Sequence, residues 1–476
     1  MAGETLDQER VLSTLNADGS RRWLNPKLSK GRWLTRRKVV GYGLIALFVI
    51  LPHLRINGKP PLLLDIINRE FTFVGTTLYP TDTLLLALLL LTIALSVFFF
   101  TALFGRIWCG WACPQTVYLE LVYRPLERLF TSKHSPFGPA GGPLKFLSYL
   151  LLSFLLAHTF LSYFVGTDAL RMWIFQSPLN HPLSFLLVIV VTVAMLFDFG
   201  YFREQLCIVA CPYGRFQSVM LDRDSLIVGY DYTRGEPRGK TKQSAKADSD
   251  LSLNVIPDTP RGDCIDCTLC VQTCPTGIDI RDGLQLECVN CTQCIDACDT
   301  VMDKIGKPRG LIRYASQREL GGEKRHFFRP RLFVYPAVIT ILVSVMTVLL
   351  VNREPALIRV LRGRGAPFTV LENGRVSNSV QVKIHDRTPD GSTYQLTLVG
   401  VEDGQVVSES TEITLAPGEI RTEPMLFCVP PQAFETGRID VELLVSTDGF
   451  ETSVPYRMLG PVYRSSRPAE GATDGN

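Results

Sequence analysis

Two cysteine runs in the middle of the chain have a spacing that predicts iron–sulfur clusters. They are Cys264-x2-Cys267-x2-Cys270-x3-Cys274-Pro275 and Cys288-x2-Cys291-x2-Cys294-x3-Cys298. In a two-cluster ferredoxin, three cysteines of each run bind one cubane cluster and the fourth binds the other cluster. We therefore expect one [4Fe–4S] cluster on Cys264, Cys267, Cys270 and Cys298, and a second on Cys288, Cys291, Cys294 and Cys274.

A pair of zinc sites is the alternative interpretation of these runs, because CxxC pairs also bind zinc. A structural zinc site needs four ligands, usually supplied by two CxxC pairs, and it leaves the third evenly spaced cysteine without a role. The regular triplets therefore favour clusters, which transfer single electrons.

A second pattern, CxxxCP, occurs twice, as Cys109-x3-Cys113-Pro114 and as Cys207-x3-Cys211-Pro212. Residues four apart lie on one face of a helix, so each pair is expected to present two thiols to one ion or to close into a strained disulfide. Four thiols in one layer suit a soft ion such as Cu(I). The alternative is that these cysteines are buried packing residues without a chemical role. The two motifs have the same spacing and the same following proline, which favours a function. Copper binding and a catalytic thiol relay stay equally open.

The composition places the chain among membrane redox proteins. Its net charge of +3 over 476 residues gives no indication of a nucleic-acid partner. Twelve of the 13 cysteines fall in the four patterned groups, which indicates metal or redox chemistry rather than a secreted disulfide framework. The remaining one, Cys428, is expected to be a small buried apolar side chain.

Five apolar stretches are long enough, or nearly so, to cross a bilayer, which takes about 20 residues. They are Val39 to Leu54, Leu84 to Leu103, Leu144 to Val165, Leu183 to Phe197 and Leu332 to Val351. Residues 62–80 carry Asp65, Arg69 and Glu70 and are expected to form a folded or interfacial loop. The first 35 or so residues are hydrophilic and show no cleavable signal peptide.

Basic residues indicate the orientation, because lysine and arginine gather on the cytoplasmic side of membrane proteins. They precede the first expected span and fill the loop before the third, at Lys27, Lys30, Arg32, Arg36, Arg37, Lys38, Arg106, Arg124, Arg128, Lys133 and Lys145. Parity then puts the cysteine runs in the cytoplasm and the C-terminal part outside. The last span alone is undecided, since arginines flank both of its ends.

The C-terminal part alternates apolar and polar residues, as half-buried strands do. The runs are Ser379 to His385, Tyr394 to Val401, Gln405 to Leu415 and Ile439 to Val445. About 100 residues of short strands at this spacing predict an immunoglobulin-like β-sandwich.

The predicted fold class is a multi-domain membrane protein with an α-helical transmembrane bundle of about five spans, a cytoplasmic two-cluster ferredoxin-like α+β domain and a C-terminal immunoglobulin-like β-sandwich. The expected order is a cytoplasmic N-terminal tail (1–37), a four-span region with both CxxxCP motifs (38–220), a cytoplasmic linker (221–260), the ferredoxin domain (261–310), a connector (311–330), a fifth transmembrane helix (331–352) and a periplasmic immunoglobulin-like domain (366–465).

These motifs together resemble one family, the cytochrome c oxidase accessory proteins of the CcoG/FixG/RdxA type, which are membrane-bound polyferredoxins. The segments that carry the resemblance are Trp108 to Thr116, Cys207 to Gln217, Tyr230 to Lys240, the two cluster runs and Gly310 to Tyr314. Nearly the whole chain is covered. One departure is Asp299, which follows the last cysteine, where many ferredoxins have proline. Because that proline is not a ligand, the departure does not affect cluster binding.

The resemblance implies a role in maturing a cbb3-type oxidase in the bacterial inner membrane. The implied activity is an oxidoreductase that reduces Cu(II) to Cu(I) for copper chaperones or other assembly factors, with Cys109, Cys113, Cys207 and Cys211 binding copper or relaying electrons. Two other functions stay open: a quinol-linked electron carrier, and a non-catalytic assembly scaffold. The electron donor is not indicated by the sequence.

Overall fold

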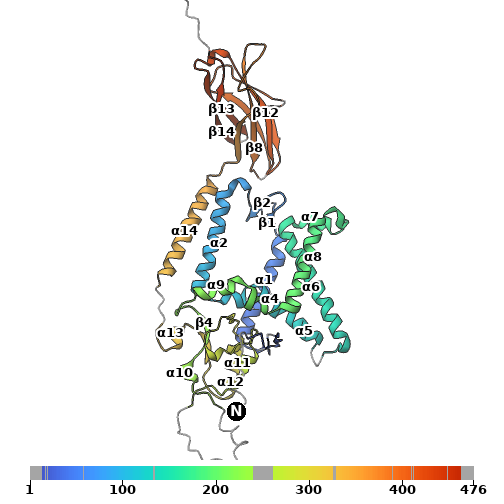
Figure 1. Cartoon of the computed structure of the whole chain (residues 1–476), viewed down its shortest axis with the longest axis vertical. Coiled ribbons are helices and arrows are strands. Elements are labelled where there is room, and N and C mark those ends of the chain that lie inside the picture. Colours follow the sequence, from blue (N-terminus) through green and yellow to red (C-terminus); the bar gives the residue numbers. More distant parts are fainter. Residues whose placement is uncertain are drawn as a thin grey trace, which may run out of the picture. The chain divides into compact units, whose positions relative to one another are not determined.

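The computed structural model describes residues 13–462, apart from 17, 19, 57, 132–134, 240–260, 325–328, 389, 409, 411 and 448. The chain divides into two compact units, residues 1–346 and 347–476 (Figure 1). The first unit holds the cysteine motifs and most of the apolar helices, and the second holds the β-rich part.

Within the described part of the chain, four helical segments are long and apolar enough to cross a membrane: Pro80–Phe104, Gly138–Val165, Pro182–Phe202 and Pro330–Val351. They contain α2 (Thr83–Phe104), α6 (Gly141–Val165), α8 (Pro182–Phe197) and α14 (Pro330–Val351). Their outer side chains are exposed, as in Leu90 (67%), Leu155 (62%) and Leu183 (77%). Lipid tails are the environment that such a surface requires. The chain is therefore a membrane protein, as its sequence predicts.

The first expected span corresponds to α1 (Arg32–Ile50), which begins seven residues before Val39. Its first turns are basic, so the apolar part covers only about 12 residues, or about 18 Å, which is short of the roughly 30 Å hydrocarbon layer. The end of α1 nevertheless lies beside the end of α6, because the Tyr163 hydroxyl donates to the Phe48 carbonyl at 2.7 Å.

Residues 62–80 form a small antiparallel sheet, so the expectation of a folded loop rather than a span is confirmed. Its strands are β1 (Leu62–Asp65), β2 (Glu70–Phe73) and β3 (Thr76–Leu78), in that spatial order. Arg55, just before it, pairs with Asp168 at 2.6 Å, beyond the end of α6.

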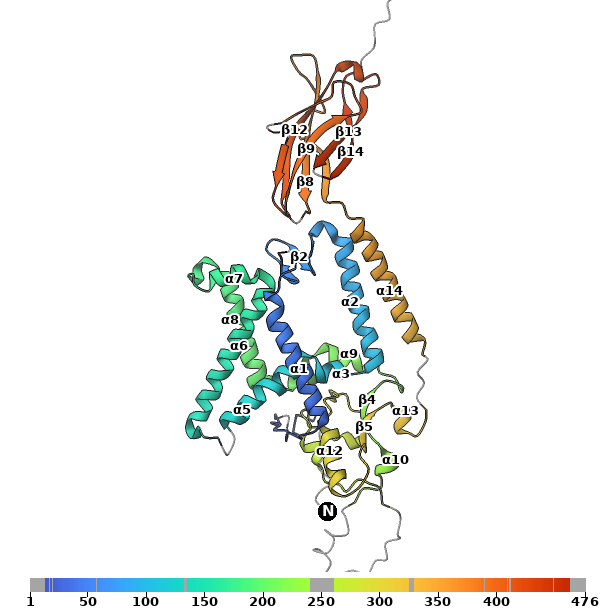
Figure 2. The same cartoon turned by 180° about the vertical axis from the view of Figure 1, so that it is seen from behind.

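Short helices follow α2 and α8 at the end of the bundle that carries the cysteines (Figure 2). After α2 come α3 (Ile107–Trp111), α4 (Pro114–Tyr118), the π-helical η3 (Leu119–Tyr123) and α5 (Arg124–Thr131); after α8 come the π-helical η6 (Asp198–Phe202) and η7 (Leu206–Ala210), then α9 (Pro212–Met220). Prolines start α4 and α9, a position where the missing N–H costs nothing.

Buried ion pairs hold these two groups of short helices together. The Arg124 guanidinium lies 3.0 Å from Glu204, and Arg203 lies 3.0 Å from Glu127. Arg124, Glu204 and Arg203 are at most 6% exposed. Removing one partner of such a pair leaves an uncompensated buried charge, so these contacts fix how the two cysteine motifs face each other.

The ferredoxin-like part contains α11 (Leu269–Gln272), the 3₁₀ turn η9 (Ile280–Asp282) and α12 (Gln293–Lys304), together with the antiparallel pair β4 (Ile227–Tyr230) and β5 (Ile312–Ala315). α10 (Tyr232–Gly235) and α13 (Gln317–Leu320) flank the strands. This confirms the α+β character.

The expected linker 221–260 and connector 311–330 are wrong in part, because β4 and β5 lie in them and pair with each other. Each strand has only four residues, too few for a periodicity to be recognised. Residues 240–260, the polar core of the expected linker, lie outside the described residues.

The second unit is a sandwich of two antiparallel sheets. One contains β6 (Ala356–Arg362), β7 (Thr369–Val370), β8 (Val376–Asp386), β10 (Gln405–Val407) and β12 (Ile420–Val429), in the order β10-β12-β8-β6 with β7 paired to β8. The other has the order β11-β9-β13-β14, from β9 (Ser392–Val399), β11 (Glu412–Leu415), β13 (Arg438–Thr447) and β14 (Phe450–Leu459).

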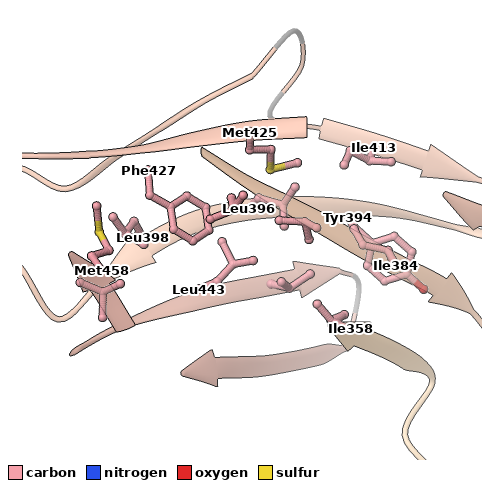
Figure 3. Close-up of a cluster of buried hydrophobic side chains, with 14 of the residues drawn as sticks. Ile358, Ile384, Tyr394, Leu396, Leu398, Ile413, Met425, Phe427, Leu443 and Met458 are labelled. Carbon is pink, nitrogen blue, oxygen red and sulfur yellow. The ribbon is translucent and has the colours of Figure 1, made fainter. Parts of the chain in front are cut away.

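Inward-facing residues from both sheets meet in one core, where Tyr394, Phe427 and Leu443 are fully buried (Figure 3). The predicted immunoglobulin-like sandwich is confirmed. The run Gln405 to Leu415 is not one strand, because β10 and β11 belong to different sheets. Cys428 is 2% exposed on β12, a packing position as expected.

Leu443→Ala tests this core. We expect it to lower the free energy of unfolding of a fragment covering residues 353–462 by about 2–5 kcal/mol, because the lost side chain leaves a cavity. Urea unfolding followed by fluorescence measures the change. Ile420→Ala, at a position 47% exposed, is the control and should change it by less than about 0.5 kcal/mol. Equal effects of the two variants would contradict the described core.

Candidate functional site

Two cavities in the ferredoxin-like part are each lined by one set of four cysteines. Cys264, Cys267, Cys270 and Cys298 line one cavity. Cys274, Cys288, Cys291 and Cys294 line the other, with Cys270 also at its wall. This is the grouping that the crossover rule gives, in which the fourth cysteine of each run joins the other set.

The two cysteine loops repeat the same backbone conformation. In the first loop Asp266 and Thr268 have positive φ angles of 54° and 56°; the matching residues of the second loop, Asn290 and Thr292, have 53° and 64°. Residues other than glycine seldom adopt this left-handed backbone conformation, which turns the chain tightly. Both loops are therefore shaped to wrap around an object, and each leads into a helix that begins inside its own cysteine run, α11 in the first and α12 in the second.

The cavities fit a buried cluster. Cys264, Cys270, Cys288 and Cys298 are buried among apolar side chains such as Ile278, Ile295 and Met302, and Cys291 is also buried. Four sulfurs in an apolar shell satisfy the ligand requirement of a cubane, and that shell limits solvent access.

Burial also sets the protonation of the free thiols. It raises the pKa of Cys288 to about 11 and that of Cys270 to about 12, so both are protonated at neutral pH until metal displaces the proton. The charges of Arg106 and Arg37 oppose this rise at Cys288 and Cys291. The same guanidinium groups favour an anionic thiolate-bound centre.

The N-terminal segment packs against this domain, which the sequence does not reveal. The Asp296 carboxylate accepts hydrogen bonds from the backbone N–H groups of Trp33 (3.2 Å) and Leu34 (2.7 Å) in the first turn of α1. The Ser13 hydroxyl donates to the Thr276 carbonyl at 2.7 Å. The expected tail 1–37 is thus wrong from residue 13 onward, within the described part of the chain. Hydrogen bonds across more than 260 positions leave no local signal.

The four CxxxCP cysteines form a second group, here called the thiol layer: Cys109, Cys113, Cys207 and Cys211. Burial is the main cause that raises the pKa of Cys207 to about 12, and the charges of the other three sulfurs raise it further. The Cys109 thiol donates to the Gln217 side-chain oxygen at 3.1 Å.

The predicted helix-face geometry of each CxxxCP pair is wrong. Cys109 lies in α3 and Cys207 in η7, whereas Cys113 and Cys211 have extended backbones (ψ 124° and 109°) and directly precede α4 and α9. The following proline disfavours the helical conformation of the residue before it. Among the described residues, no three Cys, His, Asp or Glu side chains converge at metal-ligand distance.

The thiol layer and the second cysteine loop touch backbone to backbone. A Cβ built on Gly110 would lie 2.5 Å from the Val289 carbonyl oxygen and 2.9 Å from that of Asn290, between Cys288 and Cys291. The guanidinium of Arg106, 5% exposed, donates to the Cys288 carbonyl at 3.1 Å and also to the Gly214 carbonyl in α9.

Aromatic side chains extend the same contact. The Trp111 indole N–H donates to the Tyr314 hydroxyl at 3.1 Å, and that hydroxyl donates to the Asn290 carbonyl at 3.1 Å. Trp33 packs edge-on against both rings. Sequence reasoning gave no role at this site to Trp33, Trp111, Tyr314, Arg37 or Arg106. Of these, only Arg106 has a sequence signal that could have indicated the role, because it lies beside a CxxxCP motif at the end of an apolar span.

The fold and site define a membrane-bound two-cluster ferredoxin with a C-terminal β-sandwich. Comparison with known families gives the same result: a 4Fe-4S dicluster domain matches residues 202–317, a 4Fe-4S binding domain matches residues 86–133, and the IG-like fold at the C-terminal of FixG matches residues 346–461. The match over 86–133 includes Cys109 and Cys113, which the crossover rule assigns to neither cluster.

Relatives of the whole chain identify the family. Protein RdxB of Cereibacter sphaeroides is 32% identical over 88% of this chain and 92% of its own length, and protein RdxA of the same organism is 32% identical over 75% and 78%. Nitrogen fixation protein FixG of Rhizobium meliloti is 30% identical over 89% and 88%. The chain belongs to the FixG/RdxA family and is an iron–sulfur electron-transfer protein.

Single replacements test the crossover. Because each cavity needs four sulfurs, Cys298→Ser and Cys274→Ser should each remove about four of about eight irons per chain, measured anaerobically with sulfide. Electron paramagnetic resonance of the reduced protein should show that Cys298→Ser and Cys264→Ser lose one signal, and Cys274→Ser and Cys288→Ser the other. Cys428→Ser is the control. Loss of the same signal in Cys298→Ser and Cys288→Ser would refute the assignment.

Gly110→Ala tests the contact between the thiol layer and the second loop. The new methyl group meets backbone carbonyls, which cannot move without displacing the Cys288–Cys291 loop, so we expect about half of the iron to be lost while the other cluster stays. Gly43→Ala is the matched control, since a Cβ there meets nothing within 4 Å. Full iron content in Gly110→Ala would show that the contact is dispensable.

Proposed function

We propose that the protein reduces Cu(II) to Cu(I) during the assembly of a cbb3-type cytochrome c oxidase. The observation that carries the proposal is the backbone contact between Gly110, inside a CxxxCP motif, and Val289–Asn290, inside a predicted cluster loop. At this contact the backbone of a motif with soft-metal ligands lies directly against the backbone of a predicted electron-transfer site.

The chemistry of the two groups is complementary. A bound [4Fe–4S] cluster supplies one electron at a time, which is the change from Cu(II) to Cu(I). Thiol sulfur is a soft ligand and prefers Cu(I) among the oxidation states of copper. Copper is the substrate in this proposal. Neither oxygen nor hydride takes part in its reduction, so the transfer of one electron balances the reaction.

The residues of the thiol layer bind the product. Burial raises the pKa of Cys109 to about 12, so the thiol carries its proton at neutral pH and releases it when a metal binds. Gln217 holds the Cys109 sulfur in place through the 3.1 Å hydrogen bond.

The proposal includes a location. The basic residues before α1 and around α5 favour a cytoplasmic side for the cysteine motifs, in the inner membrane of a bacterium. The sandwich is then periplasmic, where it has access to oxidase assembly factors or copper chaperones. A pure scaffold gives no reason for four thiols beside the cluster loops, and this favours the reductase.

Copper reoxidation of the reduced protein tests the activity. We expect that anaerobic protein reduced with dithionite, freed of excess reductant and mixed with Cu(II), regains its visible cluster absorbance while Cu(I) appears in a bicinchoninate assay. Because the thiol layer is the proposed copper site, Cys109→Ser/Cys211→Ser should bind less Cu(I) per chain with its iron content unchanged. Cys428→Ser is the matched control.

Two results would contradict the proposal. Absence of reoxidation beyond a copper-free sample would remove the reductase activity. Unchanged Cu(I) stoichiometry in Cys109→Ser/Cys211→Ser would remove the thiol layer as the copper site.

A further inference from the structure

A cleft of about 890 Å³ opens along α2 and ends beside the thiol layer. One wall is the α2 face from Thr92 to Phe104, and α3, Val40 of α1 and Tyr213 of α9 complete it. Figure 2 shows α3 and α9 beside the end of α2 at which Phe104 leads into the CxxxCP motif. Because α2 is a membrane-crossing helix, the cleft is reached from the lipid and has a volume typical of small-molecule sites.

The walls are aromatic and unusually exposed for large side chains. Phe100 is 59% exposed, Phe104 45% and Trp108 53%. Aromatic faces at one end of an apolar cleft suit a planar ring, which stacks with a gain of about 0.5–1.5 kcal/mol per pair beyond burial. A saturated acyl chain makes no use of that arrangement.

The polar groups at the inner end of the cleft form hydrogen bonds between different helices. The Tyr213 hydroxyl and the Thr101 hydroxyl are 3.2 Å apart, and Thr101 also accepts from the Gln217 amide at 3.5 Å. The Ser96 hydroxyl, farther out, donates to the Thr92 carbonyl of its own helix at 2.7 Å. A ligand with a long apolar tail and a polar ring therefore has a defined orientation, with its ring toward Tyr213.

The inner end is also adjacent to the electron-transfer site. Trp111 lines the cleft, and its indole N–H is hydrogen-bonded to Tyr314, which contacts the Asn290 carbonyl between Cys288 and Cys291. Trp108 precedes Cys109 directly. Because the inner end lies next to a predicted cluster loop, it favours a ligand with a redox-active ring.

We propose that this cleft binds a membrane quinol, with the ring among Phe100, Phe104 and Trp108, an oxygen at Tyr213 and the isoprenoid tail along α2 toward the lipid. The inference deepens the proposed function, on which it rests, because it names the class of electron donor. Oxidation of one quinol to the quinone would release two protons to water and two electrons, one for each of the two clusters, and would balance the reduction of two Cu(II) to two Cu(I). Membrane quinols are small amphipathic molecules that diffuse in the same layer as the mouth of the cleft.

Photolabelling of the full-length holoprotein in detergent tests the site without any turnover. An azido derivative of decylubiquinone should label peptides within residues 92–111 or at Tyr213, and unlabelled decylubiquinone should protect them whereas 1-decanol should not. Ser96→Trp, which fills the middle of the cleft, should lower the labelling by at least about tenfold, equivalent to about 1.4 kcal/mol.

Leu91→Trp is the matched control, since Leu91 lies on the opposite face of α2, is 48% exposed and does not line the cleft. It should label like the wild type. If Ser96→Trp loses iron, Val97→Trp on the same wall replaces it. Labelling elsewhere, equal labelling of the cleft-filling variant, or equal protection by decanol would overturn the proposal. None of these readouts involves copper, so the quinol site and the copper reduction can fail independently.

Discussion

The close approach of two backbones at Gly110 is the constraint on which the site depends. Two segments more than 170 residues apart meet there without side chains between them, and Arg106 and Arg37 fix the contact by donating to carbonyls on both sides. A buried guanidinium is costly unless its donors are used, so these arginines hold one arrangement of the thiol layer against the second loop. The ion pairs of Arg124 and Arg203 set the two CxxxCP motifs opposite each other in the same way.

The ferredoxin-like part has little secondary structure of its own. Apart from α12, its helices are single turns, and its sheet has two strands of four residues. An apolar core of this size contributes few kcal/mol, and small domains of this kind draw much of their folding free energy from bound metal. The sandwich is the opposite case, because its two sheets bury a continuous core without any ligand.

Local spacing made the cluster ligands predictable, since the four sulfurs of each set come from two short runs whose geometry the intervals nearly determine. The strands of the sandwich were predictable for a similar reason, as their alternation reports which face is buried. The geometry of the CxxxCP pairs was not predicted correctly. The two cysteines of each pair do not share a helix face, because a new helix begins at Pro114 and at Pro212, directly after the second cysteine. Asp296 and Tyr314 act through partners far away in the sequence, and nothing in their neighbourhood indicates those partners. Arg106 also acts at a distance, and its position beside a CxxxCP motif is the one local signal.

The cap that Asp296 provides for α1 has a consequence for how the molecule is made. A ribosome completes α1 long before it reaches Asp296, so the N–H groups in the first turn of this helix lack the carboxylate acceptor while the next three apolar helices enter the bilayer. Contacts of such sequence separation form late. The synthesis of α2, α6 and α8 must therefore precede the docking of the first turn of α1 on the ferredoxin-like part, a step that joins the earliest segments of the chain to ones made much later.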